Sequence, residues 1–181
     1  MKRAKPTVGH SAVDYRLRAI YETAIREFHE ADSAKTVTDE EYKRKRLRPE
    51  RVHLALERQM KAGVVLLMIT AAVLEQMIFS YAVTFLDSES YEKHLGRLPV
   101  LTKWIILPQL CQNKEVTEDG PAINALNELI QARNAVVHPK TRDLGSARVQ
   151  RESARFLSAC RNVKATVDAL REILQAPAPG G

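Results

Sequence analysis

The segment from Ala62 to Leu86 is almost wholly apolar, and it constrains the fold more than any other part of the chain. It is long enough to cross a bilayer as a helix. However, Glu75 and Gln76 stand in its middle, and an ionised carboxylate in lipid costs a great deal of free energy. The segment therefore predicts the central helix of a soluble bundle, buried on all sides, and not a transmembrane span. A membrane-associated protein is the less favoured alternative.

The rest of the sequence also favours helix. Only 7 Gly and 8 Pro occur in 181 residues, and long segments rich in Ala, Leu, Glu, Arg and Gln run between them. A hydrophobic fraction of 45% and a charged fraction of 28% are ordinary for a soluble globular domain. The sequence shows no internal repeat and no convincing pair of strands. We predict an all-α fold, an antiparallel helical bundle of about five to seven helices.

Periodicity and helix breakers locate the expected elements. Residues 32–38 read as a loop between a first helix and a short charged helix that begins at Asp39. Two prolines in the segment 98–110 favour short helical pieces over one helix. The other helices are expected over residues 12–31, 50–86, 91–95, 121–137 and 146–174. The domain division that follows is an N-terminal extension (1–48) with a disordered start, a helical bundle (49–175) and a disordered tail (176–181).

Charge and cysteine usage bound the function classes. The net charge of +6 and a pI of about 9.4 are compatible with a polyanionic partner and do not demonstrate one. Cys111 and Cys160 belong to no CxxC motif and have no His cluster beside them, so neither a metal site nor a disulfide framework is expected. The basic N-terminus is not followed by an apolar stretch and does not read as a signal peptide. We expect a cytoplasmic protein without a cofactor.

Two basic segments are weak candidates for binding nucleic acid. The denser one contains Lys43, Arg44, Lys45 and Arg46. A solvated helix face beside neighbouring glutamates explains this run equally well. The other segment contains Lys140 and Arg142, in the expected loop between the last two helices.

The end of the helix expected over 121–137 carries the most informative chemistry. Arg133 is a permanent cation, and His138 has the side chain that titrates near neutral pH. An Arg that holds a phosphate and a His that moves a proton suffice for metal-free phosphodiester cleavage. On a helix, residues five apart are separated by about 140°, so the two would not share a face. Pro139 disfavours the α conformation at His138, so the helix should end or bend near Val137.

Neighbouring groups fit this arrangement. Asn134 precedes His138 by four residues and could orient its ring through a hydrogen bond. Arg133 lies among apolar residues and needs an acid partner or an anionic ligand, and Glu75 is the obvious acid candidate. We therefore expect a contact between Glu75 and Arg133. The plainer interpretation is that an Arg and a His five apart are common, and that a His before Pro more often caps a helix than catalyses.

The string LNELIQARNAVVHPK (126–140) resembles the signature of HEPN domains, a helical family in which an Arg is followed by a polar residue, a few further residues and a His. Two more segments are similar to parts of bacterial members. ITAAVLEQMIFSYA (69–82) places Glu75 at an embedded acidic position, and LTKWIILPQL (101–110) matches a Lys-Trp segment. The resemblance covers roughly residues 50–170. It implies an antiparallel bundle that commonly dimerises, with the two motifs facing each other across one composite cleft.

The resemblance also implies a function. Many HEPN members are metal-independent endoribonucleases, often toxins or effectors of phage defence. Arg133 and His138 would be the catalytic residues, Asn134 and Glu75 would support them, and RNA would be the partner, together with a possible antitoxin or regulatory protein. Three alternatives stay open. They are a non-catalytic module that binds nucleotides or proteins, a membrane-associated protein, and the regulatory half of a two-component system.

Overall fold

A computed structural model describes residues 12–137 and 146–175 of the chain. This part consists mostly of helix and contains no strand, and the predicted all-α bundle is confirmed. The six helices lie in the predicted range of five to seven. Their bounds are α1 (Ala12–Lys43), α2 (Pro49–Ala82), α3 (Ser88–His94), α4 (Val100–Gln112), α5 (Pro121–Val137) and α6 (Ser146–Gln175).

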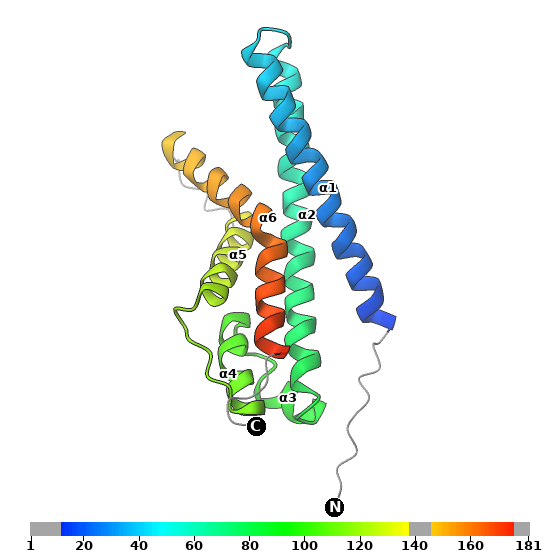
Figure 1. Ribbon diagram of the computed structural model, residues 1–181, viewed down its shortest axis with the longest axis vertical. Coiled ribbons are helices and arrows are strands. Elements are labelled where there is room, and N and C mark those ends of the chain that lie inside the picture. Colours follow the sequence, from blue (N-terminus) through cyan, green and yellow to red (C-terminus); the bar gives the residue numbers. More distant parts are fainter. Residues whose placement is uncertain (1–11, 138–145, 176–181) are drawn as a thin grey trace, which may run out of the picture.

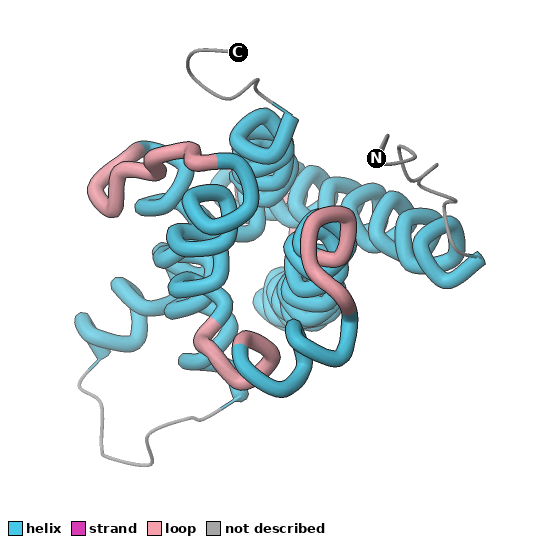
Figure 2. The backbone as a smooth tube through the Cα atoms, turned by 90° about the horizontal axis from the view of Figure 1, so that it is seen from below, coloured by secondary structure: helices cyan, strands magenta, loops and turns pink. Residues whose placement is uncertain are grey.

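A long antiparallel hairpin of α1 and α2 is the backbone of the molecule (Figure 1). The C-terminal part of α6 runs beside α2, α5 packs on α6, and α4 packs on the lower part of α2 and on α5. The N-terminal part of α6 turns away from the hairpin, and the connection between α1 and α2 projects beyond the other helices (Figure 1). Figure 2 shows the same arrangement from below, with helices joined by loops. Helix α2 is thus the shared neighbour of α1, α4, α5 and α6.

The loop expected over residues 32–38 does not exist, because α1 continues through it to Lys43. The segment contains neither Gly nor Pro. The hydroxyls of Thr36 and Thr38 donate to backbone carbonyls one turn earlier, and Lys35 pairs with Asp39. Local polar side chains that usually favour turns are therefore satisfied within the helix.

The segment around residues 98–110 also differs from the prediction, because it forms one helix, α4, and not short pieces. Pro99 stands at the N-cap, where the backbone N–H would have no intrahelical partner in any case. Pro108 lies inside the helix and is buried against the bundle. Packing of Trp104 and Leu107, neither of which is exposed to solvent, compensates for the missing backbone hydrogen bond.

Helix α2 is buried on one side only, so the expectation that it is buried all round was wrong. Leu66, Leu74 and Ile78 lie in the core, whereas Val65 is 48% exposed and Met68 41%. By length and composition α2 could cross a bilayer, the one such helix in the described chain, and this is weak evidence for a span. The core helix of a helical bundle can have the same length and composition, and one side of α2 belongs to the hydrophobic core here.

A polar cluster ties three helices together near the middle of the hairpin. Asp32 of α1 accepts two hydrogen bonds from Arg161 of α6, at 2.7 and 2.9 Å, and one from Gln59 of α2 at 2.5 Å. Gln59 is buried. The cluster holds α1 against the bundle, where Tyr21, Phe28 and other α1 residues belong to the same hydrophobic core as α2 and α6.

A buried lysine closes the far end of α6. The Nζ of Lys114 donates to the carbonyl oxygens of Ile173 and Leu174, at 3.0 and 3.3 Å. The last carbonyls of a helix have no intrahelical partner and carry partial negative charge, so an ammonium group suits them. Burial nevertheless lowers the pKa of Lys114.

Candidate functional site

Arg133 is held in place by the apolar face of α5. Ile123, Leu126, Leu129 and Ala132 of this helix are buried against α2, α4 and α6. The neighbouring stripe carries Arg133, which is half-buried. Its Nη1 donates to Oδ1 of Asn134 at 3.2 Å, while its Nε is shielded from solvent and has no hydrogen-bond partner. A shielded donor without a partner is costly to fold, and here it shows that no group of the described chain satisfies this side of the guanidinium.

The expected contact between Glu75 and Arg133 is not formed. Oε2 of Glu75 accepts instead from Nζ of Lys103 on α4, at 3.0 Å. Lys103 is buried, and its ammonium group also lies 5.9 Å from the centre of the Tyr91 ring. A buried ammonium needs an acid more urgently than a half-exposed guanidinium does. Glu75 therefore supports α4, and Arg133 has no acid partner in the part of the chain that the structure describes.

A pocket of about 340 Å³ opens beside Arg133. We call it the Arg133 pocket. Helices α2, α4 and α5 build it, with apolar side chains on the α2 and α4 sides and polar ones along α5. Its lining is Ala71, Leu74, Pro99, Val100, Leu101, Asn127, Leu129, Ile130, Arg133 and Asn134. No residue of this lining is acidic, and Arg133 is its one charged member, so the pocket suits an anion that also carries an apolar or aromatic part.

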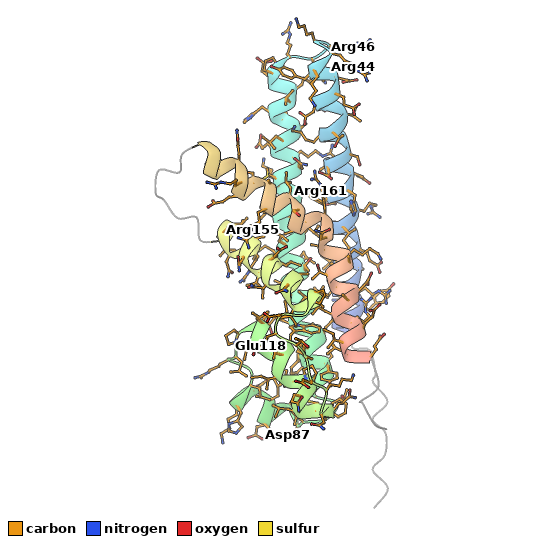
Figure 3. The ribbon with its side chains drawn as sticks, turned by 60° about the vertical axis from the view of Figure 1, so that its left-hand side comes forward. Arg44, Arg46, Asp87, Glu118, Arg155 and Arg161 are labelled. Carbon is orange, nitrogen blue, oxygen red and sulfur yellow. The ribbon has the colours of Figure 1, made fainter. Side chains whose placement is uncertain are left out.

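The other residues predicted for the site divide into two groups. His138, Lys140 and Arg142 lie outside the described residues. Lys43, Arg44, Lys45 and Arg46 are exposed at the projecting end of the hairpin, and Figure 3 labels two of them there. Along α2, this end is separated from Ala71 of the pocket by about 30 Å, at roughly 1.5 Å per residue. The four basic residues thus do not join the Arg133 pocket within one chain.

Only Arg133 and Asn134 of the pocket were predicted as site residues from the sequence, and Leu101 and Asn127 are two of the members that were missed. Leu101 belongs to the apolar α4 wall, and Asn127 lies on α5 two turns before Asn134. Residues seven apart on a helix differ by only about 20° in direction, so the repeated Asn was a usable signal. The α4 wall could not be predicted from the sequence, because its position depends on how α4 packs on α2.

A second hollow, of about 300 Å³, lies between α1, α2 and α6. Tyr21 lines it with a shielded hydroxyl that has no partner, and burial together with the nearby Asp168 raises the pKa of this phenol to about 12. Lys164 and Arg171 on its rim both pair with Asp168. Arg18 on the α1 side pairs with Glu22, so every charged group that lines this hollow has a partner within it, although a net charge of +1 remains.

Comparisons of the chain with family models, with curated proteins and with solved structures give no match. The candidate site is therefore inferred from the geometry around Arg133 and from the motif in residues 126–140.

Proposed function

We propose that this protein is a metal-independent endoribonuclease that acts through Arg133 and His138. The observation that carries the proposal is the state of Arg133. Its Nε is shielded and has no partner, no acid neutralises it among the described residues, and it faces a pocket without acidic lining. An arginine left in this state is suited to bind a phosphate. The resemblance of residues 126–140 to the HEPN signature adds the His and the reaction.

In the proposed reaction, Arg133 binds the scissile phosphate and stabilises the charge that develops on its oxygens. The ribose 2′-hydroxyl attacks the phosphorus while His138 serves as general acid or base. The bond to the 5′-oxygen of the next nucleotide breaks, and that oxygen leaves with a proton. The products are a 2′,3′-cyclic phosphate and a 5′-hydroxyl. Asn134 accepts a hydrogen bond from Arg133 and positions its guanidinium.

The proposal includes a second subunit, because the resemblance of residues 126–140 to the HEPN signature implies a cleft shared by two copies of the motif. Exposed apolar side chains support a dimer at this place. Met68 lies one turn from Ala71 of the pocket, and Val137, 39% exposed, lies one turn beyond Arg133. A second copy that covers these residues would bring its own motif next to the first. Met68→Glu should then yield a monomer by light scattering and lose RNA cleavage.

Cleavage assays with purified protein test the function. Wild type should cut single-stranded RNA in EDTA and should leave DNA of the same sequence intact, because DNA lacks the 2′-hydroxyl. Arg133→Ala and His138→Ala should each lose at least about 100-fold in rate. The matched control is His94→Ala, which removes an exposed His of α3. Equal cleavage by wild type and His138→Ala, or none by either on varied RNAs, would leave a non-catalytic nucleotide- or protein-binding module.

A cytoplasmic role as a toxin or phage-defence effector, with an antitoxin or regulatory partner, follows from the same proposal. Expression in a bacterial host should then arrest growth, and Arg133→Ala should abolish the arrest. Growth arrest that persists with Arg133→Ala would contradict this role. Purification without detergent distinguishes it from the membrane-associated alternative.

A further inference from the structure

A chain of hydrogen bonds sets the orientation of Asn127 in the Arg133 pocket. Arg155 of α6 donates from Nη2 to Oε1 of Gln131 at 2.5 Å, and Gln131 donates from Nε2 to Oδ1 of Asn127 at 3.2 Å. A guanidinium has donors and no acceptor, so the Gln131 atom that faces it must be the oxygen. The Gln131 nitrogen then faces Asn127, whose own oxygen must receive it. The group that Asn127 keeps for a ligand is its NH₂.

The same reasoning fixes Asn134. Nη1 of Arg133 donates to its Oδ1 at 3.2 Å, so the free end of this amide is again NH₂. The pocket therefore presents hydrogen-bond donors from three side chains of α5, Asn127, Arg133 and Asn134, against an apolar wall that includes Val100 and Leu101. The oxygens of Asn127 and Asn134 each accept one hydrogen bond already.

We propose that the Arg133 pocket receives the base of the nucleotide whose phosphate meets Arg133, and that it prefers uracil. This inference rests on the proposed function and names its substrate more closely. A flat ring suits the apolar wall and fits a pocket of about 340 Å³. Uracil offers two carbonyl acceptors to the amide donors and carries no exocyclic amine. Cytosine carries an amine with two N–H groups where uracil has a carbonyl, so it turns two donors toward a pocket rich in donors, whereas uracil has a single N–H, at N3.

Binding of mononucleotides tests the pocket without cleavage. Uridine 3′-monophosphate and cytidine 3′-monophosphate have the same size and charge, and inorganic phosphate serves as the reference without a base. NMR titration of the full-length wild-type protein should show uridine monophosphate binding at least about ten-fold more tightly than cytidine monophosphate. Uridine monophosphate should also bind more tightly than inorganic phosphate. Equal affinities for the two nucleotides, or no binding of either, would overturn the pocket assignment.

Gln131→Glu gives a sharper test, because it should reverse the preference. Both oxygens of the new carboxylate accept, so Asn127 has to donate its NH₂ to residue 131 and turn its oxygen toward the pocket. That oxygen can accept from the cytosine amine. The ratio of the two affinities should fall to about one or below. The ratio of affinities is the quantity to compare, because the added negative charge weakens the binding of both nucleotides alike.

The chain offers a matched control. Gln109 donates to Oδ1 of Asn113 at 2.9 Å in an exposed pair of the same kind on α4, away from the pocket lining. Gln109→Glu should leave the uridine preference unchanged, and the same loss in both variants would overturn the inference. The two proposals fail separately. RNA cleavage without a uridine preference would contradict the uracil pocket and support the nuclease. Selective binding of uridine monophosphate without cleavage would support the pocket and contradict the nuclease.

Discussion

Lys103 and Glu75 join α4 to α2 through an ion pair whose Nζ–Oε2 distance is 3.0 Å. The two partners differ in burial, because the Lys103 side chain is 5% exposed and that of Glu75 44%. The ion pair therefore stabilises the buried charge of Lys103 more than the half-exposed charge of Glu75. It also fixes α4, which supplies one wall of the Arg133 pocket. In this way the ion pair supports the site without touching a ligand.

This difference in burial predicts unequal effects of removing either partner. Glu75→Leu leaves a buried ammonium unpaired and should lower the free energy of unfolding by about 2 kcal/mol. Lys103→Met leaves a carboxylate that water can reach and should cost below about 1 kcal/mol. Urea denaturation of both variants and of the double variant measures the coupling. A larger loss of stability for Lys103→Met than for Glu75→Leu would show that the lysine is not the partner that depends more on the ion pair.

Arg133 should be dispensable for folding. Arg133→Met removes a shielded donor without a partner and keeps an apolar side chain, so the free energy of unfolding should stay equal or rise by about 1 kcal/mol. The same variant should lose binding of uridine monophosphate. The contrasting variant is Arg161→Met, which removes the two hydrogen bonds that Arg161 donates to Asp32 and should lower the free energy of unfolding by about 1–2 kcal/mol. Equal destabilisation by the two variants would argue for a structural role of Arg133.

Asp32 should make stability depend on pH. The hydrogen bonds from Arg161 hold the pKa of this carboxyl below its ordinary 3.8, and Gln59 adds to the effect. A depressed pKa in the folded state stabilises the protein above the unfolded pKa, and this contribution disappears as the pH falls through the folded value. Urea denaturation should therefore show wild type more stable than Asp32→Asn at pH 7, with the gap narrowing below about pH 4. A gap that widens in acid would contradict the sign.

Gly63 should resist replacement by Ala, although Ala is the better helix former by about 1 kcal/mol. A Cβ at this position of α2 would lie 2.8 Å from two ring carbons of Phe156 and 3.1 Å from Sγ of Cys160. The overpacking should outweigh the helix propensity and lower the free energy of unfolding by about 1–2 kcal/mol. Thermal unfolding of Gly63→Ala, with and without Phe156→Leu, measures this. Phe156→Leu should reduce the stability loss caused by Gly63→Ala. If it does not, the contact with the Phe156 ring is not the cause of the loss.

Local pattern was sufficient to predict most of the helices. A helix was predicted over residues 121–137, and α5 has these bounds, with Ile123, Leu126 and Leu129 buried along one face. Prediction failed where a tertiary contact outweighed a local signal. Asp32 read as the start of a loop, and Arg161 and Gln59 hold it inside α1. Neither partner is near Asp32 in the sequence, so no local rule could have identified the contact.

The candidate site shows the same limit. The sequence pointed to Arg133 and to a buried acid for it, but the acid belongs to Lys103, which lies 28 residues from Glu75. Choosing between two cations required knowing which helix packs on α2 beside Glu75. The repeated Asn of α5 was visible in the sequence, while the orientation of its amide depends on Arg155, from another helix.

Lys114 has a consequence for shortening the chain. Its buried ammonium group depends on the carbonyls of Ile173 and Leu174, which complete α6. A version that stops before Ile173 would remove both acceptors of this ammonium group and the end of α6 that it holds, although Lys114 lies far from the deletion in sequence. Truncation from the C-terminus should therefore be tolerated down to Leu174 and fail abruptly just beyond it. The smallest autonomous folding unit is set at this end by a single lysine sixty residues upstream.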